Sequence, residues 1–257
     1  MKKIIQISLF ILTVIVLITL TGFIVITNMH TKVTDVEINI YRNSENGFIS
    51  KGEILEVINN IDSINQIEVQ KVKIGIIEKA LTLNPYVDKV DSYITINGSL
   101  LINLREKQPI IRIYDKGKYG FYLDAKGNIF PISRQYAPRV IIANGYIKDE
   151  ISTNGGNIND SIYDNSVYRE LFELTKLINN NKLLKAQINQ IYVNSKGCYD
   201  LIPELGNHLI QFGSMEDSEI KIKNLDAYYK KYLKTGIWDS YKTINLTYKN
   251  QIVCTKK

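Results

Sequence analysis

The feature that most constrains this chain is an uncharged, apolar stretch near its amino terminus. From Ile4 to Thr27 the sequence contains no Asp, Glu, Lys or Arg. As an α-helix this stretch would extend about 36 Å, which exceeds the roughly 30 Å hydrocarbon core of a bilayer. A cleaved signal peptide has a shorter apolar region that is followed by small residues, whereas NMHTK follows here. We therefore predict an uncleaved transmembrane helix over residues 4–27.

The charged residues beside this helix predict its orientation. Lys2 and Lys3 precede the helix, and positively charged flanks stay on the cytoplasmic side of a membrane. We therefore expect a cytoplasmic tail over residues 1–3, a single span, and export of everything after Thr27. The working part of the chain would then lie outside the cytoplasmic membrane.

Residues 90–109 (VDSYITINGSLLINLREKQP) have the pattern of a β-hairpin with one apolar face. The main apolar residues occupy even positions on both arms, so a two-residue loop at Asn97-Gly98 would put them on opposite faces. A three-residue loop with Gly98 in the left-handed region, a type I turn with a G1 bulge, keeps them together. The predicted pairs are Ile94 with Leu100, Ser92 with Ile102 and Val90 with Leu104.

Two amphipathic helices and a strand upstream of the hairpin are expected to cover its apolar face. In residues 48–61, Ser50 followed by Glu53 predicts a capping box, and Ile49 with Ile54 predicts a hydrophobic staple. A shorter helix is expected in residues 73–85, and alternating apolar residues in 32–41 predict a strand. The order strand-helix-helix-strand-strand predicts a small α+β module over residues 28–107.

After Pro109 the sequence alternates β-rich runs with turn residues, which predicts a second domain over residues 108–257. One hairpin is expected in 119–133, and a second lies in 242–257, where a loop at Lys249-Asn250 would pair Leu246 with Val253. Apolar residues at helical spacing predict a helix that begins at Ser161 and another over about 217–233. We expect a mostly antiparallel β domain with flanking helices.

The motifs offer no support for catalysis. Neither His30 nor His208 has a metal-ligand partner at helical spacing, and no G-x-S-x-G, Gly-rich phosphate loop or S-x-x-K motif occurs. The net charge of +6 comes from scattered lysines, which disfavours nucleic-acid binding. Cys198 and Cys254 are expected as half-buried strand residues, although an oxidising compartment would permit a disulfide between them. We predict no catalytic residue, no metal site and no cofactor.

Several stretches together resemble the bacterial cell division family FtsQ, called DivIB in Gram-positive bacteria, and are most similar to its Bacteroidetes branch. They are residues 84–114, 121–133 with 137–145, and 236–257. The first resembles the second half of a POTRA domain and its exit into the β domain. The last resembles the terminal strands of that β domain. The resemblance covers essentially the whole chain, and the order of the stretches is more specific than any one of them.

The resemblance implies a non-catalytic scaffold of the division machinery, anchored in the inner membrane with its domains in the periplasm at the septum. Members of this family bind the bitopic proteins FtsB and FtsL and link early division proteins to septal peptidoglycan synthesis. In the family, the partner adds a strand to the last strand of the β domain, because a terminal strand offers unpaired backbone groups. Here that strand would be 251–255. The partner-binding residues expected on this basis are Tyr248, Gln251, Ile252, Val253, Cys254, Thr255, Trp238 and Tyr241.

Alternatives stay open at this point. Trp238 and Tyr241 would equally serve to close the core under the last helix. The chain differs from proteobacterial relatives in its short cytoplasmic tail and final turn, so their individual contacts do not transfer. A membrane-anchored POTRA-type docking or chaperone module for envelope protein assembly or secretion is the second function, although that class usually has tandem modules or a membrane barrel. An anchored envelope hydrolase is the third.

Overall fold

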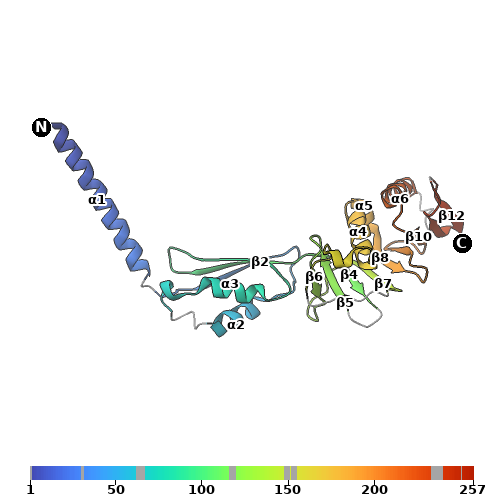
Figure 1. Cartoon of the computed structure of the whole chain (residues 1–257), viewed down its shortest axis with the longest axis horizontal. Coiled ribbons are helices and arrows are strands. Elements are labelled where there is room, and N and C mark those ends of the chain that lie inside the picture. Colours follow the sequence, from blue (N-terminus) through green and yellow to red (C-terminus); the bar gives the residue numbers. More distant parts are fainter. Residues whose placement is uncertain are drawn as a thin grey trace. The chain divides into compact units, whose positions relative to one another are not determined.

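The computed structural model describes residues 2–29, 32–61, 67–115, 120–147, 151, 155–232, 240–249 and 251–257. The chain divides into two compact units, Met1–Lys107 and Gln108–Lys257. Figure 1 shows the elements of each unit, coloured along the chain. Each unit contains its own β-sheet.

The amino-terminal helix α1 (Lys2–Met29) contains the uncharged stretch. Its segment Ile5–Gly22 has a mean hydropathy of 2.3, and none of the side chains in that segment is buried. Within the described residues, α1 is the single helix that is long and apolar enough to cross a bilayer. A helix with apolar side chains exposed on all sides fits a single-pass membrane anchor.

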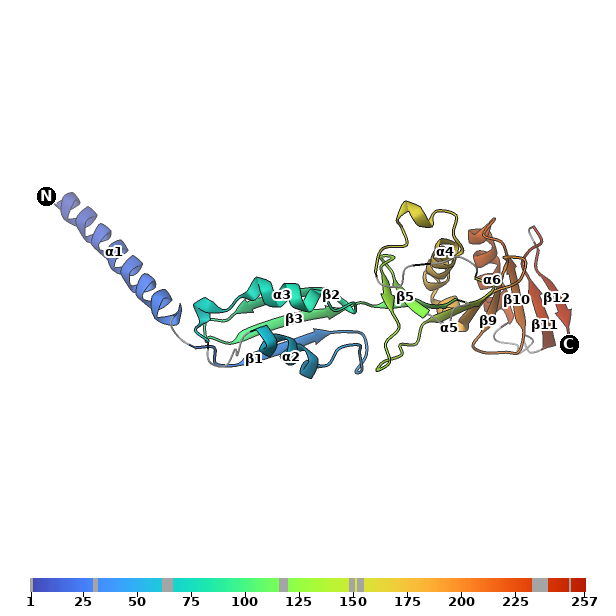
Figure 2. The same ribbon diagram turned by 60° about the horizontal axis from the view of Figure 1, so that its bottom comes forward.

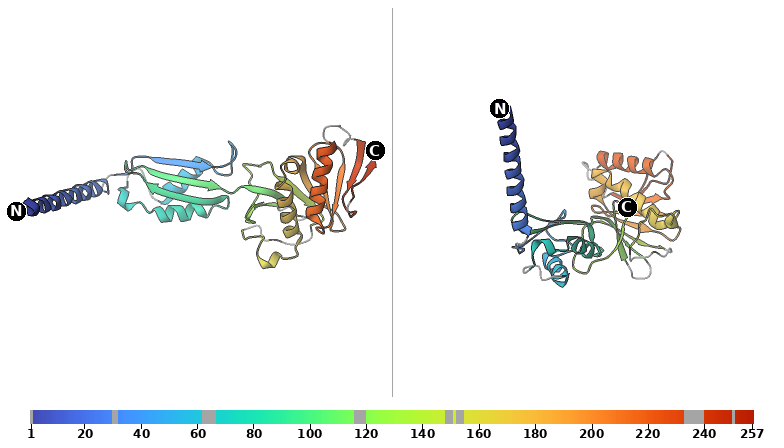
Figure 3. Two further views of the ribbon diagram at one scale, coloured as in Figure 1. Left: turned by 90° about the horizontal axis from the view of Figure 1, so that it is seen from above. Right: turned by 60° about the vertical axis from the view of Figure 1, so that its left-hand side comes forward.

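The first sheet has three strands in the order β1-β3-β2. The elements follow the chain as β1 (Val36–Tyr41), α2 (Lys51–Ile61), a 3₁₀ turn η2 (Val69–Lys71), α3 (Ile74–Thr82), β2 (Val87–Ile94) and β3 (Leu100–Glu106). Strand β3 is parallel to β1 and antiparallel to β2. The predicted order strand-helix-helix-strand-strand is confirmed. Both helices cover the same face of this sheet (Figure 3).

The β2–β3 hairpin has the predicted register, and all three predicted pairs are present. Gly98 has φ +83°, and its N–H donates to the Thr95 carbonyl at 2.9 Å, which closes the three-residue loop. On β3 the apolar side chains of this face are fully buried; they are Leu100, Ile102 and Leu104. The positions of the apolar residues on the two strands therefore predicted the length of the loop correctly.

Helix α2 begins with the predicted capping box. The Ser50 N–H donates to the Glu53 carboxylate at 2.7 Å, and the Glu53 N–H donates to Ser50 Oγ at 3.2 Å. Ile49 and Ile54, the two residues of the predicted staple, are both buried. The exchange of hydrogen bonds satisfies two N–H groups that an uncapped helix would leave without partners.

The second sheet has nine strands in the order β12-β11-β10-β9-β8-β7-β4-β5-β6. Most neighbours are antiparallel, and the parallel pairs are β4–β7, β7–β8 and β10–β11. The strands are β4 (Pro109–Tyr114), β5 (Gly120–Asp124), β6 (Ile129–Pro131), β7 (Ile141–Gly145), β8 (Ile188–Val193), β9 (Tyr199–Pro203), β10 (Leu209–Gly213), β11 (Tyr241–Asn245) and β12 (Val253–Lys256).

The helices of this unit are the 3₁₀ turn η3 (Ser161–Tyr163), α4 (Val167–Asn179), α5 (Lys182–Gln187) and α6 (Ser218–Tyr232). Helices α4 and α6 lie on the same side of the sheet (Figures 2 and 3). Leu171 of α4 and Leu225 and Tyr229 of α6 are fully buried against alternate residues of the strands. Helix α6 connects β10 to β11, and because these strands are parallel, the connection must cross the face of the sheet.

The predicted helix start at Ser161 is wrong. Ser161 opens only the single turn η3, and Asn165 then adopts φ +63°, which interrupts the helix. Helix α4 begins after Ser166, whose side chain accepts a hydrogen bond from the Arg169 N–H at 3.2 Å. Helix α5, whose N-cap is Asn181, was not predicted from the sequence.

The predicted register of the last hairpin is wrong by one residue. Val253 lies opposite Asn245 rather than Leu246, and Asn250 of the predicted loop lies outside the described residues. Leu246 is buried, and its N–H donates to the Gln211 carbonyl of β10 at 2.9 Å. The Asn245 side chain accepts from the Thr247 N–H at 2.9 Å and turns the chain away from β12. The strand also begins at Val253 instead of residue 251.

Candidate functional site

Strand β12 is the last strand at one edge of the nine-stranded sheet. Within the described part of the chain, its only ladder partner is β11. The outer edge of such a strand presents N–H and C=O groups that an incoming strand can pair with. The site is therefore built around this edge.

The backbone groups that face the open edge follow from the register. The Lys257 N–H donates inward to the Ser240 carbonyl at 3.1 Å. Residues of an antiparallel strand alternate between pairing inward and facing outward. Val253 and Thr255 therefore pair with β11, whereas Cys254 and Lys256 turn their N–H and C=O groups outward.

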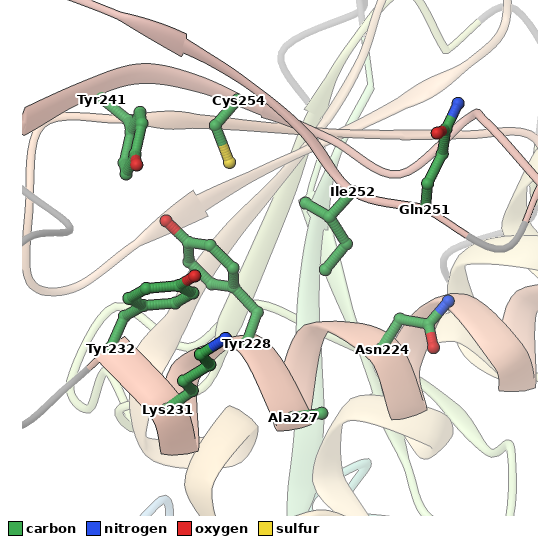
Figure 4. A pocket seen from close by; sticks show the side chains of 9 residues that line it. All are labelled: Asn224, Ala227, Tyr228, Lys231, Tyr232, Tyr241, Gln251, Ile252 and Cys254. Atoms are coloured by element: carbon green, nitrogen blue, oxygen red, sulfur yellow. The ribbon is translucent and has the colours of Figure 1, made fainter.

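A groove with a volume of about 490 Å³ lies between α6 and the β11–β12 hairpin. The hairpin contributes Tyr241, Gln251, Ile252 and Cys254 to its lining. Helix α6 contributes Asn224, Ala227, Tyr228, Lys231 and Tyr232. Figure 4 shows Ile252 pointing toward α6, and the rings of Tyr228 and Tyr232 rising from the helix toward the hairpin.

The centre of the groove is aromatic and weakly polar. The Tyr228 ring packs against that of Tyr232, with centroids 4.8 Å apart. Burial raises the pKa of Tyr228 above its usual range, and the neighbouring Cys254 thiol adds to this effect. Burial also raises the pKa of the Cys254 thiol. Since the thiolate is the reactive form of cysteine, Cys254 is better suited to packing than to nucleophilic chemistry.

The structure brings four of the residues named from the sequence together at this groove: Tyr241, Gln251, Ile252 and Cys254. Tyr248 is 51% exposed and lines a smaller adjacent hollow of about 230 Å³, which shares Asn224 with the groove. Val253 and Thr255 lie on the opposite face of the sheet, because their neighbour Cys254 faces the groove. Trp238 lies outside the described residues.

No residue of α6 is among the partner-binding residues expected from the sequence. Tyr228 and Tyr232 are four residues apart and share a helix face, which was compatible with either a core or an interface role. Tyr228 and Tyr229 are both buried in the core, and Tyr228 also lines the groove together with Tyr232. The spacing of Tyr228 and Tyr232 was the one signal in the sequence that could have pointed to this side of the groove.

The histidines and cysteines considered from the sequence form no catalytic or metal-binding arrangement among the described residues. His208 is buried, and its Nε2 lies 2.9 Å from the Tyr229 hydroxyl. Cys198 and Cys254 are both free and half-buried. His30 lies outside the described residues. Among the residues that are described, no group of three His, Cys, Asp or Glu side chains is arranged to hold a metal ion.

The comparison with protein families agrees with this architecture. A POTRA-like domain model matches residues 31–105, which include β1, β2 and all of β3 except its last residue, Glu106. The model described as "FtsQ/DivIB, C-terminal related" matches residues 108–255, which is more than half of the chain and includes the groove. No curated protein matches the chain. The extent of the second match shows that this chain belongs to the FtsQ/DivIB family of cell division proteins.

Proposed function

We propose that this protein is a membrane-anchored divisome scaffold that captures FtsB-like and FtsL-like bitopic partners at β12 and the adjoining groove. The FtsQ/DivIB-related and POTRA-like domains make it a division-associated protein of a non-enzymatic kind that interacts with other division proteins. Binding these partners would link early division proteins to septal peptidoglycan synthesis.

One observation carries the proposal: the open edge and the groove lie side by side. Outward-facing backbone groups can add a strand of any sequence, and a groove beside them can select particular side chains. Cys254 supplies both features, because its backbone faces the edge and its side chain lines the groove. The partner site would therefore comprise Tyr241, Gln251, Ile252 and Cys254 together with α6, whereas Val253 and Thr255 would support it from the opposite face.

The proposed location in the cell follows from α1. Its apolar segment would span the inner membrane once, with Lys2 and Lys3 in the cytoplasm. The POTRA-like and carboxyl-terminal units would then both lie in the periplasm, at the septum. There they can reach the exported segments of bitopic partners.

The experiment that tests the interface is co-purification of the full-length chain, in detergent, with the exported segments of its FtsB-like and FtsL-like candidates. Ile252→Asp should reduce recovery of the partner at least tenfold, because burial of an isoleucine contributes about 1.5–3 kcal/mol and a carboxylate there would be desolvated. Ile162→Asp is the matched control, since it places the same charge on an exposed isoleucine outside the groove and should leave recovery unchanged. Full recovery with Ile252→Asp would refute the interface.

Depletion of the protein in its host separates the scaffold from the alternative envelope role. Blocked septation and filamentation are expected for a divisome scaffold. Outer-membrane defects with normal septa would instead support the POTRA-type docking or chaperone function, which the POTRA-like match keeps as the second candidate.

A further inference from the structure

We infer that the edge and groove select an extended partner segment that is apolar at its centre and acidic where it passes Lys231 and Lys256. The inference rests on the proposed strand addition at β12, and it specifies the chemistry of the incoming segment. It follows from the register of β12, the lining of the groove and the distribution of lysines.

The register decides which partner side chains enter the groove. Cys254 and Lys256 have outward backbone groups, and their side chains lie on the face where Cys254 sits opposite Ile244, which is the face of the groove that Ile252 also lines. Ile244 is fully buried beneath α6. Residues of an added strand that face α6 must therefore become the cross-strand neighbours of these three side chains.

The centre of the groove favours apolar side chains. Ile252 and Cys254 contribute half-buried side chains from the hairpin, and Tyr228 is only 7% exposed. The Tyr228 hydroxyl is buried beside the Cys254 thiol. A charged partner residue at this position would lose its hydration without gaining an opposite charge.

The end of the groove beyond Cys254 favours carboxylates. Lys231 and Lys256 are both exposed, and within the described residues neither forms an ion pair. Lys230, the neighbour of Lys231, is by contrast engaged by Asp226 at 2.6 Å. Lys231 lines the groove, with its Nζ 5.3 Å from the centre of the Tyr232 ring, and Lys256 lies on β12 two residues after Cys254, so both border the position that an incoming strand would occupy.

The charge of the whole edge excludes a second copy of this chain as the preferred occupant. Residues 240–257 contain Lys242, Lys249, Lys256 and Lys257 and no Asp or Glu. Two such edges paired together would bring like charges into one ladder, which is unfavourable. The same lysines complement a partner strand with carboxylates and would guide its approach.

The test is a selection of random ten-residue displayed peptides on the full-length chain in lipid nanodiscs. We expect peptides with two apolar residues at alternate positions, flanked by Asp or Glu, to be enriched. Their affinity should fall about three- to tenfold for the double variant Lys231→Glu/Lys256→Glu at low salt. The same peptides should bind normally to Lys196→Glu/Lys223→Glu, which carries the same charge change on exposed residues outside the groove.

Enrichment without acidic residues, failure of any peptide to enrich, or equal losses for both double variants would each overturn the inference. The proposed function has a separate outcome. Co-purification with division partners that is insensitive to Lys231→Glu/Lys256→Glu would leave the scaffold role intact and reject the acidic segment. Acidic peptides that bind while no division partner is recovered would reject the scaffold role alone.

Discussion

A proline at position 254 would distinguish a partner that pairs with the backbone of β12 from a partner that contacts only side chains. The Cys254 N–H faces the open edge, whereas the N–H groups of Val253 and Thr255 face β11. Proline lacks an N–H, and it is tolerated on an edge strand where that group would face solvent. Cys254→Pro should therefore leave the pairing of β12 with β11 intact and remove one donor from the edge.

The expected loss of partner affinity follows from the single hydrogen bond that the variant cannot donate. An incoming strand would leave one carbonyl without a donor, which costs about 1–3 kcal/mol. This corresponds to a roughly 5- to 150-fold weaker partner affinity at about 1.4 kcal/mol per factor of ten. Cys254→Ala is the matched control, because it removes the thiol but keeps the N–H.

The assay is titration calorimetry of the full-length variants with the exported FtsB-like segment, together with urea unfolding of each variant. Cys254→Pro should lose affinity relative to Cys254→Ala while both unfold at similar urea concentrations. Val253→Pro should also lower stability, because it removes an inward hydrogen bond to β11. If Cys254→Pro binds as tightly as Cys254→Ala, the partner does not pair with the backbone of β12.

Three further predictions concern the fold. Ser50→Ala removes the side-chain acceptor that the Glu53 N–H uses and should destabilise the POTRA-like unit by about 1 kcal/mol, measured by urea unfolding. The Glu78 carboxylate accepts a hydrogen bond from the Ser92 N–H of the edge strand β2 at 2.7 Å and so occupies a donor that another strand could pair with. Glu78→Ala should therefore increase self-association measured by light scattering, whereas Glu78→Gln, which keeps an acceptor, should not. Burial raises the pKa of Tyr229, so its contribution to stability is complete below the usual tyrosine pKa of about 10 and is lost at higher pH. In an absorbance titration Tyr229 should ionise at a higher pH than a free tyrosine, and ionisation at the free-tyrosine pH would contradict its burial.

Several features could be read from the sequence because their causes lie within a few residues of each other. The capping box of Ser50 and Glu53 spans one helical turn. The loop at Gly98 follows from the alternation of apolar residues on two adjacent strands. The apolar run in α1 could be recognised without tertiary contacts, because its length and composition alone fit a membrane anchor.

The misread details depended on distant parts of the chain or on an unusual backbone conformation. The register of β12 is set by Leu246, whose hydrogen bond to Gln211 of β10 joins residues that are remote in sequence. The start of α4 is displaced by the positive φ of Asn165, a conformation that no hydrophobic pattern reports.

The sequence alone determined that an apolar helix precedes a β-α-α-β-β module and a β-rich domain that ends on a strand. It did not determine which strands neighbour each other, because β10 and β11 are parallel and are separated by the whole of α6. That crossover lays α6 beside the terminal hairpin and creates the groove lined by Tyr228, Tyr232 and Ile252. Only the tertiary structure could decide this. Parallel strands are paired when the crossover helix between them packs against the sheet, and this packing joins residues that are distant in sequence, so no local pattern predicts it.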